Sequence, residues 1–241
     1  MNKYLEDTNL LNYNHPIVQK LIRDRKWKNL NDHDKIQQTY LFVRDEISFG
    51  FNKNDELQSS EILKDGYGQC NTKTILLMSI LRGVGISCRF HGFTINKALQ
   101  KGVISGIWYK LAPKNIIHTW VEVRYKKKWQ NLEGVILDKK YLNQLQKKFK
   151  NCKGNFCGYG VNTNNFQNPK IDWNNNDTYI QKWGINKDFG IFDNPDDFYK
   201  NHKQNLSFLK LIIFNLITRK SMNNNIKEVR NGSFKNQGNY K

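Results

Sequence analysis

The sequence predicts an α+β fold in which helices come first and an antiparallel sheet follows. Apolar residues recur at helical spacing through about residue 84, whereas segments between residues 86 and 133 alternate apolar and polar positions as half-buried strands do. No internal repeat is present. A run of helices followed by a run of strands is typical of the α+β class.

Four helices are expected in the first third of the chain. His15-Pro16 opens the first helix, and Asn31 or Asp32 caps the second. The last of the four is strongly apolar and is brought to a close by Gly83 and Gly85. The expected ranges are about 15–27, 31–47, 59–66 and 71–84.

Three strands are expected next, over residues 86–93, 117–125 and 129–133, with a long loop-like insert between the first two. Lys126-Lys127 is interpreted as a two-residue hairpin turn, although it lacks an Asn-Gly or Asp-Gly signal. In this register Tyr125 pairs with Lys128, and Trp120 pairs with Glu133.

The rest of the chain carries weaker signals. We expect a helix over about 138–149, an irregular Gly- and Asn-rich loop over 151–176, and an apolar helix over 205–217. The acidic cluster from Asp193 to Asp197 is interpreted as a solvated turn. The predicted organisation is a single domain over residues 1–220 and a polar C-terminal tail over 221–241.

The charge balance indicates a basic surface. The 241 residues include 39 Lys and Arg and 21 Asp and Glu, which gives a formal net charge of +18. The basic residues are spread along the chain and no nucleic-acid-binding motif accompanies them, so a nucleic acid partner is not expected. No apolar segment approaches the roughly 18–20 residues of a membrane span. The N-terminus lacks the apolar segment of a signal peptide, so a cytoplasmic protein without a membrane partner is expected.

The four cysteines do not form a metal-binding pattern. Cys70, Cys88, Cys152 and Cys157 include no CxxC pair, and no His cluster lies at ligand spacing. Neither a metal nor another cofactor is therefore expected. Without an export signal, Cys152 and Cys157 are expected as free thiols, and Cys88 as a core residue of a strand.

Cys70 is the candidate nucleophile. It lies where a Gly-rich connector ends and the apolar helix begins. Free N–H groups and the helix dipole at such a position favour the thiolate, so a lowered pKa is expected. The alternative is an ordinary small buried cysteine.

His118 is the candidate base. Side chains alternate along a strand, so His118, Trp120 and Glu122 share one face. In the predicted register Glu133 is a diagonal neighbour of His118, and its carboxylate can reach the imidazole and fix its tautomer. The alternative is a structural histidine beside a surface acid.

Two blocks of sequence resemble the transglutaminase-like superfamily. The first is YGQC over residues 67–70, followed by the apolar helix and LRGVGISCR over 81–89. The second is HTWVE over 118–122, followed by WQNLE over 129–133. The two blocks occur in the family's order, and the resemblance covers about residues 40–138. It implies a papain-related fold, with a catalytic cysteine at a helix N-terminus packed on an antiparallel sheet.

The resemblance also implies a catalytic triad. Cys70 takes the position of the nucleophile, His118 of the general base and acid, and Glu133 of the orienting carboxylate. The family usually has Asp at the third position, so Glu133 is a departure, and Asn131 on the same strand face is the alternative orienter. Residues that could line the substrate cleft are Gln69, Trp120 and Asn131, with Trp108 and Tyr109 as a substrate lip.

The implied activity is acyl transfer from amide bonds of a protein or peptide substrate through a thioester. Water as acceptor gives an amidase or cysteine protease, and an amine gives a protein-glutamine transamidase; hydrolysis is favoured because nothing specifies an amine site. Removal of glycans from asparagine is a weaker reading because the zinc-binding cysteine pairs of those enzymes are missing. A catalytically silent protein-binding module is the alternative of a different class.

Overall fold

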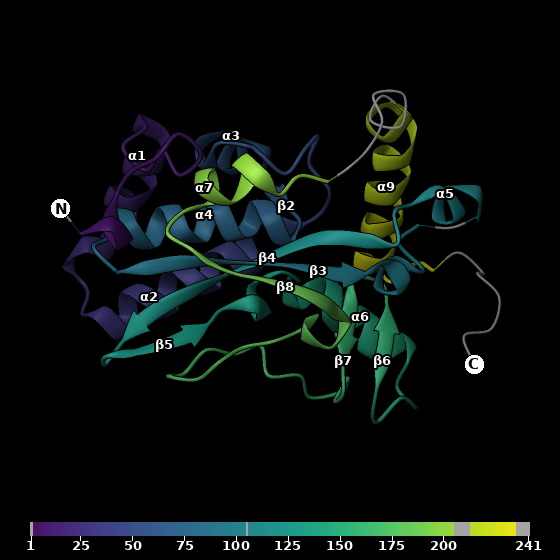
Figure 1. Ribbon diagram of the computed structural model, residues 1–241. Coiled ribbons are helices and arrows are strands. Elements are labelled where there is room, and N and C mark those ends of the chain that lie inside the picture. Colours follow the sequence, from purple (N-terminus) through teal and green to yellow (C-terminus); the bar gives the residue numbers. More distant parts are fainter. Residues whose placement is uncertain (1, 105, 205–212, 235–241) are drawn as a thin grey trace.

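A four-stranded antiparallel sheet lies at the centre of the molecule (Figure 1). The computed structural model describes residues 2–104, 106–204 and 213–234. The strands follow the order β5-β4-β3-β8. Their bounds are β3 Cys88–Asn96, β4 Asn115–Tyr125, β5 Lys128–Asn131 and β8 Ile185–Phe192. The α+β class expected from the sequence is therefore confirmed.

The hairpin β4–β5 turns where the sequence predicts. Lys126 and Lys127 have φ of 45° and 66°, the left-handed pair of a type I′ turn, whose twist matches that of the strands. Tyr125 pairs with Lys128, as expected. The ladder ends with Asn131 opposite Glu122, so the expected pairing of Trp120 with Glu133 is wrong. Glu133 instead begins a 3-10 turn, η5 (Glu133–Val135).

Helices cover one face of the sheet, and α4 lies against β3 and β4 (Figure 1). Every residue of α4 is buried, including the apolar run Ile75–Met78 and polar residues such as Lys73 and Arg82. Around it pack α1, α2 and α3. The helix bounds are α1 Pro16–Asp24, α2 Asp32–Leu41, α3 Ser59–Asp65, α4 Cys70–Gly83, α5 Gly106–Leu111, α6 Lys139–Lys148, α7 Pro195–Asn201 and α9 Arg219–Arg230.

Short elements connect these layers. The strands β1 (Ser48–Phe49) and β2 (Tyr67–Gly68) form a parallel pair, and β6 (Phe156–Gly158) and β7 (Val161–Thr163) form a small hairpin within the segment expected to be irregular. The insert between β3 and β4 contains a 3-10 turn, η4 (Lys97–Gln100), and α5. Two π-helical turns, η3 (Phe42–Glu46) and η7 (Phe214–Thr218), adjoin α2 and α9.

Two elements differ from the sequence expectation on the C-terminal side. The strand β8 was not expected, because most of its residues are exposed or half-buried at a sheet edge and so lack a clean apolar alternation. The acidic cluster at residues 193–197 contributes to the N-terminus of α7 instead of forming a solvated turn. Asn194 caps this helix, and Phe198 is fully buried against β3.

The polar segment after Ser221 also differs from expectation, since it belongs to α9. Met222, Ile226 and Val229 recur at helical spacing and are buried, which overcomes the polar composition of the segment. Of the apolar helix expected over 205–217, residues 205–212 lie outside the described part of the chain. The division into a domain and a tail stays a prediction.

None of the described helices is long and apolar enough to cross a bilayer.

Candidate active site

The start of α4 is fastened to the strand that carries His118. Cys70 is the first residue of the helix. The side chain of the next residue, Asn71, donates to the carbonyl oxygen of Ile117 at 3.2 Å and accepts from the hydroxyl of Thr119 at 3.1 Å. These two residues flank His118 in β4. The two blocks of sequence that contain Cys70 and His118 therefore meet in the fold.

His118 and Glu133 form a completely buried pair. The imidazole Nε2 and the carboxylate Oε1 are 2.9 Å apart, and both side chains have no exposed surface. The other oxygen, Oε2, accepts the backbone N–H groups of Ile180, Gln181 and Lys182 at 2.7, 3.0 and 3.2 Å. Three donors from one loop hold this carboxylate in place, so the longer side chain that departs from the family pattern is fully accommodated.

The pairing leaves one imidazole nitrogen free. A carboxylate only accepts hydrogen bonds, so Nε2 donates its proton and Nδ1 carries the lone pair. Within the described part of the chain, Nδ1 is buried and has no hydrogen-bond partner. A buried acceptor without a partner is uncommon and calls for an explanation, and an incoming proton from a nucleophile is one.

Asn131 does not contact the imidazole through any hydrogen bond of its side chain. Its oxygen accepts from the indole N–H of Trp120 at 2.8 Å, and its amide group donates to the hydroxyl of Tyr179 at 2.8 Å. Trp120 is buried and packs at a tilt of 35° against Phe93, with ring centroids 4.0 Å apart. The ring of Trp120 lies beside that of His118, with centroids 6.0 Å apart, and Asn131 supports the indole. Glu133, and not Asn131, is the hydrogen-bond partner of the histidine.

The pKa of the Cys70 thiol is raised, opposite to the sequence expectation. The main cause is burial, which penalises the thiolate, and the negative charges of Asp55 and Glu133 add to it. Backbone N–H groups of Asn71 and Cys70 act in the opposite direction, as expected at a helix start, but they are outweighed. The thiol donates to Asn71 Oδ1 at 3.6 Å. The raised pKa keeps the Cys70 thiol protonated at neutral pH.

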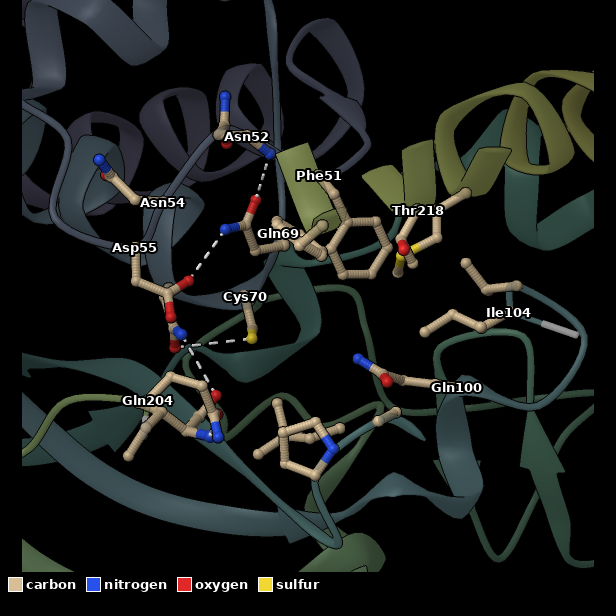
Figure 2. A pocket seen from close by; sticks show the side chains of 18 of the residues that line it. Phe51, Asn52, Asn54, Asp55, Gln69, Cys70, Gln100, Ile104, Gln204 and Thr218 are labelled. Carbon is tan, nitrogen blue, oxygen red and sulfur yellow. Dashed lines mark hydrogen bonds between the residues drawn. The ribbon is translucent and has the colours of Figure 1, made fainter. Parts of the chain in front are cut away.

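A polar cluster that the sequence analysis missed lies next to Cys70. The amide group of Gln69 donates to Asp55 Oδ1 at 2.9 Å, and its oxygen accepts from the backbone N–H of Asn52 at 2.9 Å. Figure 2 shows this chain of contacts beside the thiol. Asp55 comes from the loop between β1 and α3, and no spacing rule connects such a loop residue to the cysteine. Both ends of the Gln69 side-chain amide are thus engaged in hydrogen bonds, one with Asp55 and one with Asn52.

A cavity of about 350 Å³ adjoins the thiol. Cys70 lies between Asn54 and Asp55 on one side and Phe51 and Ile104 on the other (Figure 2). Trp108, expected at a substrate lip, lines this cavity, and Gln69 lines it as well. Tyr109 is not among the residues that line it, and its ring lies under the ammonium of Lys97 at 5.0 Å.

The comparisons with known proteins concern the core of the chain. Residues 19–134 match the family model described as the transglutaminase-like superfamily, so the match begins earlier than the resemblance in the sequence and includes part of α1 and all of α2. No curated protein matches the chain.

Two solved structures are similar at low identity. One is a proposed cysteine protease from Cytophaga hutchinsonii, with a TM-score of 0.46, 10% identity, and coverage of 80% of this chain and 47% of the other. The other is red sea bream transglutaminase, with a TM-score of 0.31, 16% identity, and coverage of 54% and 27%. The chain spans about half and about a quarter of these two proteins. Residues 19–134, just under half of the chain, therefore form a core of the transglutaminase-like superfamily.

Proposed function

We propose that the protein is a thiol-dependent acyl-transfer enzyme that acts on amide bonds of proteins or peptides, with Cys70 as nucleophile, His118 as general base and acid, and Glu133 as the orienting carboxylate. The observation that carries the proposal is the buried His118–Glu133 pair. It leaves a single basic nitrogen, Nδ1, without a partner, on the strand to which the start of α4 is fastened.

The first half of the proposed reaction forms a thioester. Because the thiol is neutral at rest, His118 Nδ1 takes its proton as the Cys70 sulfur attacks the amide carbonyl carbon. The new S–C bond places negative charge on the carbonyl oxygen. The backbone N–H of Cys70, in the first turn of α4, is one donor to this oxygen. The C–N bond then breaks, and His118 returns the proton to the departing amine.

The second half releases the acyl group. His118 takes a proton from water, the hydroxide adds to the thioester carbonyl, and the C–S bond breaks as His118 returns the proton to the departing sulfur, which gives a carboxylic acid and the free thiol. An amine in place of water would give a new amide and make the enzyme a transamidase. We propose hydrolysis as the main outcome, since water needs no acceptor site.

A catalytically silent binding module is the second candidate. The burial of Cys70, which is 9% exposed and whose pKa is raised, favours it. The same burial also fits an enzyme whose thiol is activated only when the substrate is bound.

Substitutions at the triad test the proposal. Cys70→Ala should abolish amide hydrolysis with an unchanged melting temperature. Glu133→Gln should lower kcat by roughly 10²–10⁴-fold, because it removes the carboxylate that fixes the imidazole tautomer. Turnover is measured with a library of peptide anilides. Asn131→Ala is the control and should retain kcat within about tenfold, since Asn131 supports Trp120 and not His118. Unchanged turnover in Cys70→Ala would contradict the role of Cys70 as nucleophile, whereas no turnover of any peptide by the wild-type protein would favour the binding module.

A further inference from the structure

We propose that the cavity beside Cys70 is an acyl-donor site for substrates that carry a bulky apolar group on the carbonyl side of the scissile amide. The inference rests on the proposed acyl-transfer function and names its substrate class. The chemistry is shared by a fatty acyl chain and by a large apolar amino-acid side chain.

The size and lining of the cavity indicate an apolar occupant. Its volume of about 350 Å³ lies in the range of pockets that enclose a drug-sized ligand and exceeds the need of a primary amide alone. Most of its wall is made of apolar side chains, which gain little from a polar ligand. They come from separate segments of the chain and include Phe51, Leu99, Val103, Ile104, Phe214 and Met222.

The position of the cavity identifies which half of the substrate it holds. Among the described residues, Cys70 and Asn71 line it, but neither His118 nor Glu133 does. The leaving amine takes its proton from His118 and so departs on the imidazole side. The group that stays on the sulfur lies on the other side, where the cavity is. The cavity therefore receives the acyl half.

Fixed contacts hold the wall together. Asn223 of α9 accepts from the backbone N–H of Phe51 at 2.7 Å and donates to its carbonyl oxygen at 3.0 Å. Asn225 donates to the carbonyl oxygen of Val103 at 2.9 Å. The helix α9 thus connects the wall around Phe51 to the wall around Val103, and its own Met222 also lines the cavity. Since α9 lies outside residues 19–134, this specificity is a feature of the chain beyond the family core.

Alkyl chloromethyl ketones test the site without any need for turnover. Sulfur displaces chloride from these reagents, and their alkyl group occupies the place of the acyl chain. As the alkyl group grows from methyl to nonyl, the labelling rate of Cys70 should rise by up to about fourfold for each methylene until the cavity is full. Peptide mass spectrometry reports each cysteine separately. The exposed Cys157 is the internal control and should show no such rise.

Matched variants localise the effect. Ile104→Phe narrows the cavity and should reduce the nonyl-to-methyl rate ratio at Cys70 at least tenfold. Ile107→Phe is the control, because Ile107 is 58% exposed and does not line the cavity. A labelling rate at Cys70 that does not depend on chain length in the wild-type protein would overturn the proposal.

Two substrate series distinguish the sources of the apolar group. One is a set of fatty acyl anilides of increasing length, and the other a set of capped peptide anilides with Gly, Leu or Phe before the scissile bond. A rise of kcat/KM in either series supports the site and identifies the source of the apolar group. Turnover of both series with no rise in either would overturn the proposal. Labelling that depends on the length of the alkyl group, without turnover of any substrate, would support the apolar site and reject the enzymatic function.

A separate observation assigns a second hydrogen-bond donor for the reaction. Tyr199 of α7 lines the same cavity, is 3% exposed, and its hydroxyl has no hydrogen-bond partner in the described part of the chain. We infer that this hydroxyl donates to the carbonyl oxygen of the substrate as it becomes negatively charged. Burial and the nearby Asp55 and Cys70 raise the pKa of Tyr199, so the hydroxyl keeps the proton that it must donate.

Peptide aldehydes test this role, because they form a hemithioacetal with Cys70 whose oxygen occupies the same position. Tyr199→Phe should weaken aldehyde inhibition and lower kcat, each by about 10²-fold, with little change in KM. The rate at which methyl chloromethyl ketone labels Cys70 in Tyr199→Phe is compared with the rate in the wild-type protein. Equal rates show that the thiol remains accessible in the variant. Aldehyde inhibition of wild-type strength in Tyr199→Phe would overturn the assignment.

Discussion

Individual residues set the state of the nucleophile. Cys70 begins a helix, which by itself would stabilise a thiolate, yet burial and two nearby carboxylates raise the thiol pKa. In the proposed mechanism, the histidine therefore removes the proton from the thiol as the sulfur attacks. Glu133 makes this feasible, because three backbone donors fix the carboxylate that orients His118.

Removing the charge of Asp55 should make the thiol more acidic. In Asp55→Asn the side-chain oxygen can still accept from Gln69, but the negative charge that raises the Cys70 pKa is gone. Alkylation of Cys70 by iodoacetamide at pH 7.5 should be severalfold faster. Glu56→Gln is the matched control, because Glu56 pairs with Lys203 and is not a cause of the shift. Equal acceleration by both substitutions would contradict the assigned cause.

The residues of the site differ in how well the sequence predicts them. His118 and Glu133 are predictable because strand alternation and a two-residue turn bring them to one place, even though the ladder ends two residues early. Asp55 and Tyr199 are not, since one is in a loop and the other is on a helix distant in the chain. The raised thiol pKa also escapes the sequence, because burial depends on packing by the whole fold.

Packing between elements decides how α7 sits on the sheet. Gly92 of β3 lies directly under Phe198 of α7, and a Cβ at Gly92 would overlap the phenyl ring. The absence of a side chain at this position lets α7 approach the sheet and bring Tyr199 to the cavity. The position of α7, a helix that the sequence pattern did not predict, thus depends on the glycine at position 92 of β3.

The substitution Gly92→Ala should therefore destabilise the fold. The overlap with Phe198 forces the helix away from the sheet, at a cost of about 1–3 kcal/mol in the free energy of unfolding. Urea unfolding measures the change, and the double variant Gly92→Ala/Phe198→Leu should recover part of it. Gly154→Ala is the control, because nothing lies within 4 Å of its Cβ position. A loss below about 0.5 kcal/mol in Gly92→Ala would contradict the packing model.

At the scale of the elements, the helices and the hairpin were predictable, whereas β8, α7 and α9 were not. The first group has strong apolar periodicity. The second group combines polar composition with a few buried side chains, such as Met222 and Ile226 of α9. Their burial can be recognised only once the surface against which they pack is known. The cavity is built largely by the segment of residues 49–56 and by the insert between β3 and β4, with Tyr199 of α7 and Met222 of α9, so its existence was not predictable either.

The molecule as a whole is organised around α4, which includes a fully buried lysine. Lys73 donates to the carbonyl oxygens of Arg44 and Ile136 at 3.0 Å each, and so joins the end of α2's continuation, η3, to the turn that carries Glu133. Burial lowers its pKa to about 7, despite the opposing attraction of Asp138 and Asp45. Its titration therefore couples the stability of the entire fold to pH.

Lysine 73 should make stability rise with pH between about 7 and 10.5. In this window the unfolded chain binds a proton at Lys73 that the folded protein does not hold, so raising the pH removes a cost of folding. The difference in unfolding free energy between wild type and Lys73→Met should change in favour of wild type by at most about 1.4 kcal/mol for each pH unit. Urea titrations of both proteins across the window measure it. A difference that stays constant with pH would mean that Lys73 is not titrating there.

The most direct test of the proposed function is to trap the acyl group on Cys70. The wild-type protein is mixed with an excess of an activated amide substrate, quenched in acid within milliseconds to seconds, and its intact and peptide masses are measured. We predict an adduct of the acyl mass on the peptide containing Cys70, which decays as product appears, is absent in Cys70→Ala, and forms more slowly in Glu133→Gln. Turnover that proceeds without any adduct on Cys70, or an adduct that forms equally fast in Glu133→Gln, would contradict the proposed triad.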